Sequence, residues 1–290
     1  MSTAPNIDPV SGRSTTGHEW DGLHELNTPL PKWWVYLFAI TVVWALVWFV
    51  LMPAVPLWGT HTTGLLGYSP RAQVDRSVAA ITAERAVFMD KIRAMSFDQI
   101  RENPELLAVA ENAGRVAFAN NCQPCHGPGG EGRIGYPALG DDVWLWGGTL
   151  DQIRQTITHG IRSPDDADTH QSQMPAFGKD GVLTPEQIQQ VADSVMTLYG
   201  TPVPGKDTKG GAQIFAENCA PCHGDKGQGN RDMGAPPLAS HIHLYAATRD
   251  AVVAQITNPH MGLMPAWGKK LDEATIKSLA LYVHSLGGGE

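Results

Sequence analysis

The chain has 290 residues, of which 42% are hydrophobic and 17% are charged, and its formal net charge is -8 at pH 7. This length exceeds that of one ordinary domain, and the composition is typical of a globular protein that also carries a membrane segment. The negative charge argues against a nucleic-acid partner.

The first predicted element is a transmembrane helix within residues 33–58. From Trp33 to Met52 the chain runs for twenty residues without a charged residue, Gly or Pro. At about 1.5 Å of rise per residue such a helix reaches about 30 Å, the thickness of a bilayer's hydrocarbon core. Trp34 near its start and Trp58 beyond its end are placed like residues of a membrane–water interface.

A cleaved signal peptide is the alternative interpretation of this run. More than thirty residues, including the acidic Glu19, Asp21 and Glu25, precede it, and a small-residue cleavage pattern does not follow it. We therefore predict a retained anchor. The lysine and arginine residues on its two sides do not decide its orientation.

Residues 59–107 are predicted to form a linker that contains an amphipathic helix. Apolar residues recur there at roughly helical intervals among charged ones: Val74, Val78, Ile81, Phe88, Ile92 and Met95. This helix either packs on the following domain, which we prefer, or docks on a partner subunit.

Two copies of Cys-x-x-Cys-His use all four cysteines of the chain. They are Cys122, Cys125 and His126, and then Cys219, Cys222 and His223. This pentapeptide is the attachment site of c-type haem, in which two thiols form thioethers with one porphyrin and the histidine binds its iron. A redox disulfide or a zinc site is the alternative, but neither explains a histidine directly after each pair. We predict two covalently bound haem c groups.

The two motifs lie in an internal repeat. Its units are residues 108–200 and 208–290, joined by a short linker at 201–207. Equivalent middle helices are expected after Thr149 and Thr248, and equivalent terminal helices after Thr184 and Asp272. The terminal helices share one apolar pattern: Ile188, Val191, Ala192, Val195 and Leu198 in the first, and Ile276, Leu279, Ala280, Val283 and Leu286 in the second. We therefore expect a mainly α fold, with the anchor followed by two tandem class I cytochrome c domains that touch.

The repeat also contains a candidate sixth iron ligand in each unit. Met174-Pro175-Ala176-Phe177-Gly178 recurs as Met264-Pro265-Ala266-Trp267-Gly268. Proline disfavours helix at the preceding residue, so each methionine lies in a loop. We predict His126 with Met174 at the first iron, and His223 with Met264 at the second. A thioether ligand favours ferrous iron and is typical of electron carriers.

Other candidate ligands lack a counterpart in the repeat. They are Met233, Met261, His159, His170, His241, His243 and His260. The acidic residues Asp165, Asp166 and Asp168 are interpreted as a solvated loop in preference to a surface that steers a basic carrier. The sequence indicates no catalytic residues, so the chain is expected to carry electrons and to transform no substrate.

Covalent haem attachment implies an oxidising compartment. We therefore expect a single-pass protein of the bacterial inner membrane, with residues 1–32 in the cytoplasm and the haem domains in the periplasm.

The segment before the anchor resembles a known family. Trp20-Asp21-Gly22-Leu23 and the run from Glu25 to Trp34 are similar to the N-terminal signature of the di-haem subunit III of cbb3-type cytochrome c oxidases. The resemblance implies that electrons arrive from a bc1 complex or a c-type cytochrome. They would pass to a mono-haem subunit and a haem-copper catalytic subunit, where oxygen becomes water and protons are pumped. It also implies the ligand pairs predicted above.

Two other functions share these features. An anchored di-haem shuttle, or the cytochrome subunit of a periplasmic dehydrogenase, would have the same anchor and haem domains. A haem-based gas sensor would differ in leaving one side of the iron open.

Overall fold

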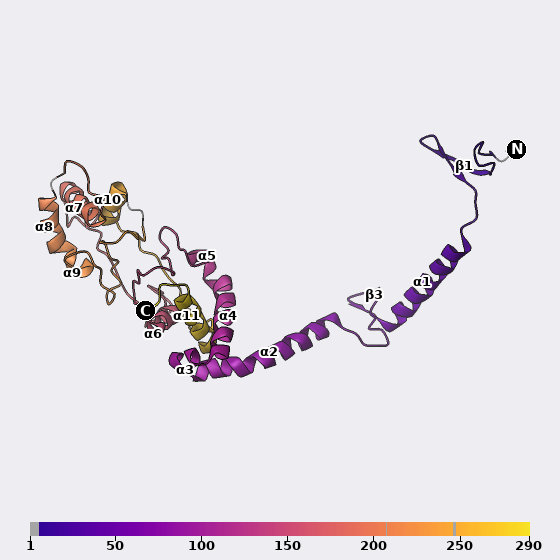
Figure 1. The fold of residues 1–290 in the computed structure, drawn as a ribbon, viewed down its shortest axis with the longest axis horizontal. Helices are drawn as coiled ribbons and strands as arrows, with labels where there is room; N and C mark the ends of the chain where they lie inside the picture. Colours follow the sequence, from indigo (N-terminus) through magenta and orange to yellow (C-terminus); the bar gives the residue numbers. More distant parts are fainter. Residues whose placement is uncertain (1–5, 207, 246–247) are drawn as a thin grey trace. The chain divides into compact units, whose positions relative to one another are not determined.

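The computed structural model describes residues 6–206, 208–245 and 248–290. The chain divides into two compact units, with the boundary between Ile81 and Thr82. Figure 1 shows the ribbon coloured along the sequence, with helices and strands labelled. Each unit is described here by itself.

The first unit contains the apolar helix and two small hairpins. Strands β1 (Thr15–Trp20) and β2 (Leu23–Leu26) pair antiparallel, as do β3 (Pro56–Leu57) and β4 (Thr60–His61). Helix α1 (Lys32–Leu51) is long and apolar enough to cross a membrane, and all but its last residue are exposed. It ends before the expected limit of 58, because Pro53 and Pro56 cannot continue a helix.

The hairpin β1–β2 was not expected from the sequence. Its turn is Asp21-Gly22, and both residues have positive φ, 49° and 85°. This is the backbone that a tight two-residue turn between antiparallel strands requires, and Asp-Gly is one of its preferred sequences. Trp20-Asp21-Gly22-Leu23, the first part of the family signature, thus forms the turn of a hairpin ahead of helix α1.

The second unit is helical. Helix α2 (Pro70–Ala94) leads into it, and the remaining helices are α3 (Phe97–Arg101), α4 (Pro104–Asn121), α5 (Gln123–His126), α6 (Leu150–His159), α7 (Pro185–Leu198), α8 (Lys209–Asn218), α9 (Ala220–His223), α10 (Arg249–Thr257) and α11 (Glu273–Ser285). The expected starts are confirmed: Thr149, Thr184, Thr248 and Asp272 each accept a hydrogen bond from the first turn of the helix that follows. The mainly α fold is confirmed as well.

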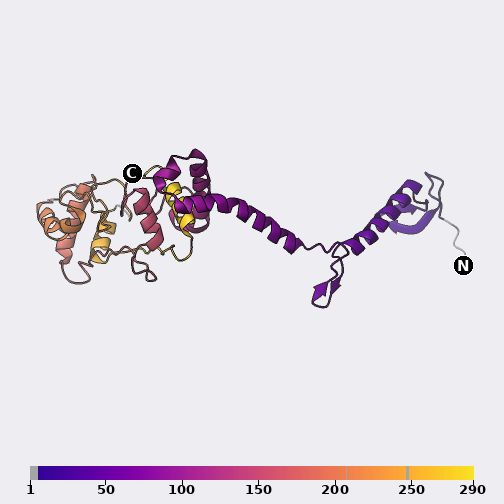
Figure 2. The same cartoon turned by 90° about the horizontal axis from the view of Figure 1, so that it is seen from below.

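These helices form two lobes that exchange their terminal helices. Helix α11 packs against α4 and α6, whereas α7 packs against α8 and α10. We call α4, α5, α6 and α11 the first lobe and α7, α8, α9 and α10 the second lobe. Figure 2 shows the yellow α11 beside the purple helices and not beside the orange ones. Each lobe has its own buried cluster, with Phe118 and Leu279 in the first and Phe215 and Val191 in the second.

The expected units 108–200 and 208–290 therefore do not describe the packing. Each lobe takes its haem motif and middle helix from one repeat and its terminal helix from the other. The physical reason is that α7 and α11 carry the same apolar stripe. The stripe determines which face of a helix is buried, but it does not determine which helix covers that face.

A pair of equivalent glycines fixes the same close helix crossing in both lobes. Gly114 and Gly211 each lie eight residues before the first cysteine of a motif. A methyl group on Gly114 would collide with the backbone oxygen of Ser278 in α11, and one on Gly211 with that of Gln190 in α7. Because glycine has no side chain, the helix that precedes each haem motif, α4 or α8, can lie in contact with the backbone of the terminal helix, α11 or α7.

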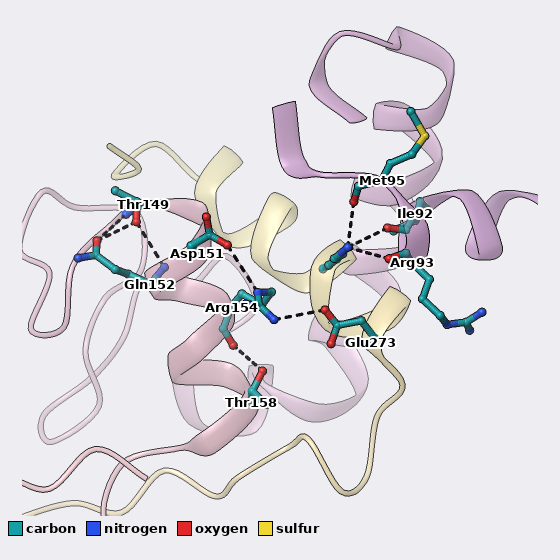
Figure 3. A network of polar contacts seen from close by, with 10 residues as sticks. Ile92, Arg93, Met95, Thr149, Asp151, Gln152, Arg154, Thr158 and Glu273 are labelled. Carbon is teal, nitrogen blue, oxygen red and sulfur yellow. Dashed lines mark hydrogen bonds and ion pairs between the residues drawn. The ribbon is translucent and has the colours of Figure 1, made fainter. Parts of the chain in front are cut away.

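The C-terminal end of helix α2 packs on the first lobe. Ile92 is fully buried and Phe88 lies against the same core, whereas Val74, Val78 and Ile81 are exposed. The Lys277 ammonium group of α11 donates hydrogen bonds to the backbone oxygens of Ile92, Arg93 and Met95, at 3.4, 2.8 and 2.9 Å. Figure 3 shows these three residues near the ion pair between Arg154 and Glu273 that joins α6 to α11. The expected packed connector is thus confirmed for this end.

We expect Lys277→Met to destabilise the second unit by about 1–3 kcal/mol, because three backbone oxygens lose a charged donor at the end of α2. Urea unfolding followed by far-UV circular dichroism measures this change. Lys179→Met, which alters an exposed lysine in the loop before α7, serves as the control and should have little effect. Equal stability of the two variants would contradict the role given to Lys277.

Candidate haem sites

Each haem motif lies on one helical turn. Helix α4 ends at Asn121, and α5 follows directly, with the His126 N–H donating to the Cys122 oxygen at 2.9 Å. In the second lobe the His223 N–H donates to the Cys219 oxygen at the same distance. Residues three and four apart share one face of a helix. Both thiols and the imidazole of each motif are therefore presented together.

Backbone carbonyls orient the two histidines. Nδ1 of His126 lies 2.9 Å from the oxygen of Pro137, and Nδ1 of His223 lies 2.9 Å from the oxygen of Pro236. A carbonyl only accepts, so Nδ1 carries the proton and Nε2 keeps a free lone pair. This is the tautomer that an iron ligand needs, and a carbonyl partner of this kind is usual for metal-binding histidines.

Burial affects the ionisation of both motifs in the same way. Burial lowers the pKa of His126 and of His223 and so favours neutral imidazoles. The carbonyl partners act in the opposite direction, but burial has the larger effect. Burial, together with the neighbouring cysteine, raises the pKa of Cys122 and of Cys219 to about 11. None of the four cysteines forms a disulfide, so all four are available for haem attachment. Burial thus favours the neutral forms of Cys122, Cys219 and the two histidines, from which thioethers and an iron–imidazole bond are made.

Met264 lies in the first lobe, with Cys122. Both are partly buried against the first core cluster. The backbone of Met264 exchanges two hydrogen bonds with Ile161, at 2.9 and 3.0 Å, and the Trp267 N–H donates to the Ile157 oxygen of α6 at 3.1 Å. The loop that carries Met264 therefore lies along the end of α6.

Met174 lies in the second lobe by the equivalent arrangement. It packs against the second core cluster, which contains Cys219. The Lys179 N–H donates to the Thr257 oxygen at the end of α10, at 2.9 Å. Each methionine loop precedes a terminal helix in the chain and packs in the same lobe as that helix, which contains the haem motif of the other repeat. Met264 thus packs with Cys122 and Met174 with Cys219, whereas the expected pairs were Met174 with His126 and Met264 with His223.

Several of the other candidate ligands have structural partners. His159 Nδ1 lies 3.0 Å from Asp166, His170 Nε2 lies 3.1 Å from Thr156 Oγ1, and His243 stacks on Tyr199. The bond from His159 lowers the pKa of Asp166, so this carboxylate is held by the fold and is not merely solvated. Met233 and Met261 are exposed by 45% and 42%.

Sequence reasoning missed the two carbonyls that orient the histidines, although a signal was present. Pro137 and Pro236 each precede a leucine by two residues. The backbone N–H groups of these leucines, Leu139 and Leu238, donate to the backbone oxygens of Gly130 and Gly227, both at 2.7 Å. The repeat therefore includes the loop that closes over each histidine. Its unequal spacing, 11 residues after His126 and 13 after His223, concealed the match.

The donor set in each lobe fits haem c: two cysteines outside any disulfide, an imidazole with an available Nε2 and a partly buried thioether. Fold and site together define a c-type cytochrome with two cytochrome lobes behind a candidate membrane anchor. Residues 12–59 match the N-terminal domain of cytochrome oxidase-cbb3, FixP, and residues 109–193 and 206–283 match cytochrome c oxidase, cbb3-type, subunit III.

Similar proteins cover the whole chain. It is 51% identical to the cbb3-type cytochrome c oxidase subunit FixP of Bradyrhizobium diazoefficiens, over 100% of both chains. It is 50% identical to subunit CcoP of Azospirillum sp. strain B510 and 49% identical to subunit FixP of Sinorhizobium medicae, over 98% of each chain. The chain belongs to the family of cbb3-type cytochrome c oxidase subunit III, which confirms the resemblance noted in its sequence.

Proposed function

We propose that this chain is the membrane-anchored electron-transfer subunit of a cbb3-type oxidase and that it carries two haem c groups, the first at Cys122 and Cys125 and the second at Cys219 and Cys222. The observation that carries the proposal is that both the pre-anchor segment and both repeats match this family. A bound haem c supplies a one-electron ferric–ferrous couple.

The packing within each lobe supports one assignment of the iron ligands. Nε2 of His126 and the thioether of Met264 would hold the first iron, and His223 with Met174 would hold the second. The carbonyls of Pro137 and Pro236 keep each imidazole oriented. With two protein ligands the iron would have no open position for a gas and would serve as an electron carrier, which disfavours the sensor function.

The partners are the other subunits of the oxidase. Electrons come from a bc1 complex or a c-type cytochrome and leave toward the mono-haem subunit and the haem-copper catalytic subunit, where oxygen reduction and proton pumping take place. The chain itself contributes binding and electron transfer. Its charge of -8 suits a basic donor.

The orientation follows from haem chemistry. Helix α1 crosses the bacterial inner membrane, residues 1–32 stay in the cytoplasm, and the two lobes lie in the periplasm. Covalent attachment of haem to cysteine thiols takes place in an oxidising compartment, which supports this orientation. Helix α1 has the length and composition to span the membrane once.

Purification from native membranes tests this function. We expect two haems per chain by mass, one in the double variant Cys219→Ala/Cys222→Ala, and copurification of a mono-haem cytochrome and a haem-copper subunit. Copurification with a dehydrogenase and no haem-copper subunit would instead favour the alternative function. The match of residues 12–59 to the oxidase family argues against that alternative.

A further inference from the structure

The loops that follow the two haem motifs have the same backbone. The Gly132 N–H donates to the His126 oxygen and the Gly229 N–H to the His223 oxygen, both at 2.8 Å. Residues 127–133 thus correspond one by one to residues 224–230. The surroundings of the two haem motifs are therefore similar here, so a difference in side-chain charge between the loops would distinguish the two haem sites.

Glu131 and Gln228 occupy equivalent places. The Gly129 N–H donates to Oε2 of Glu131 at 2.9 Å, and the Lys226 N–H donates to Oε1 of Gln228 at 3.0 Å. A methyl group on Gly127 would collide with the Glu131 carboxyl group, and one on Gly224 with the Gln228 amide. Each side chain therefore folds back onto the residue that follows the iron-binding histidine. It is charged in the first lobe and neutral in the second.

A cation lies on the same loop of the first lobe. Arg133 donates from its guanidinium to the Pro124 oxygen at 2.8 Å, between the two haem-binding cysteines, and lies 4.7 Å from the centre of the Tyr136 ring. The equivalent residue, Asn230, is neutral and accepts from the Asp232 N–H at 2.9 Å. Asp225 and Lys226 of the second loop are exposed and have no ionisable counterpart in the first, where Pro128 and Gly129 stand.

These charges have opposite effects on a redox centre. Reduction adds one electron to ferric iron without making or breaking a bond, so the oxidised site carries one more positive charge. A nearby carboxylate stabilises the oxidised form and lowers the potential, and a nearby guanidinium raises it. We propose that Glu131 and Arg133 form an opposed charge pair that sets the reduction potential of the first haem. The second lobe lacks this pair, because the neutral residues Gln228 and Asn230 stand at the equivalent positions. The inference rests on the proposed binding of two haems.

Both side chains are exposed, so water screens their effect. In a redox titration of the intact two-haem chain, Glu131→Gln should raise the ferrous-to-ferric ratio of one component about two- to fivefold at fixed electrode potential, the scale of an exposed charge interaction. This is a rise of about 20–40 mV, since a tenfold change corresponds to about 59 mV for one electron. Arg133→Asn should lower the same component by a similar amount.

Matched changes in the second lobe serve as controls. Gln228→Glu should lower the potential of the other component and leave the first where it was. The shifts should shrink as ionic strength rises, as a purely structural effect would not. A fall or no change with Glu131→Gln, or an equal shift of both components, would overturn the inference. A haem count per chain on the same samples separates this failure from failure of the two-haem proposal.

Discussion

Replacement of Met264 by histidine is expected to lower the potential of the haem attached at Cys122 and Cys125 by on the order of 0.1–0.2 V, within the ~0.8 V range that axial ligands set. A second imidazole stabilises ferric iron where the thioether favoured ferrous iron. The expectation follows from the packing of Met264 and Cys122 against one core cluster. Redox titration of the double variant Cys219→Ala/Cys222→Ala, which keeps only the first haem, measures the shift.

Met174→His is the matched control in this background. Met174 packs in the second lobe, so its replacement should leave the first haem unchanged. The converse holds when the first haem is removed by Cys122→Ala/Cys125→Ala. In the intact chain each methionine variant should move one titration component only. If Met174→His were the change that lowers the potential of the first haem, the exchanged pairing would be wrong.

The second large effect is expected at the glycines of the helix crossings. Gly211→Ala places a methyl group against the Gln190 backbone oxygen, so α8 and α7 must separate. We expect a loss of stability of about 1–3 kcal/mol, the usual cost of overpacking, although alanine favours helix by up to about 1 kcal/mol. Gly114→Ala should have the same effect in the first lobe, where it would push α4 away from α11.

The neighbouring Gly210 provides a close control. It lies in the same helix α8, is exposed, and a methyl group there would lie 3.4 Å from the Gln190 side chain. Gly210→Ala should therefore be neutral or stabilising. Thermal unfolding of the haem-loaded chain, followed by circular dichroism and by haem absorbance, compares the variants. Equal melting temperatures for the Gly210 and Gly211 variants would show that the helices can part at no cost.

The sequence predicted the helices better than it predicted which helices pack against each other. The caps at Thr184 and Asp272 and the apolar stripes of α7 and α11 are local features, and the structure has them where expected. The choice between two lobes is not local. Ile188 and Ile276 occupy the same place in identical stripes, so periodicity could not show that α11 covers α4. The exchanged places of Met174 and Met264 follow from that one missing fact.

The equivalent glycines illustrate what was available in the sequence. Gly114 and Gly211 indicate a close crossing in each repeat, and the residues opposite them, Ser278 and Gln190, lie at matching places in α11 and α7. The crossing could have been predicted, but not which terminal helix makes it. The hairpin β1–β2 had a clearer signal, since Asp21-Gly22 is a preferred turn between strands.

The most direct test of the exchanged lobes is to identify the methionine bound to each iron. In the reduced chain that keeps only the haem at Cys122 and Cys125, nuclear magnetic resonance of methyl-labelled methionine should give one signal strongly shifted by the haem ring. We predict that this signal disappears with Met264→Leu and remains with Met174→Leu. Its loss with Met174→Leu and persistence with Met264→Leu would contradict the account.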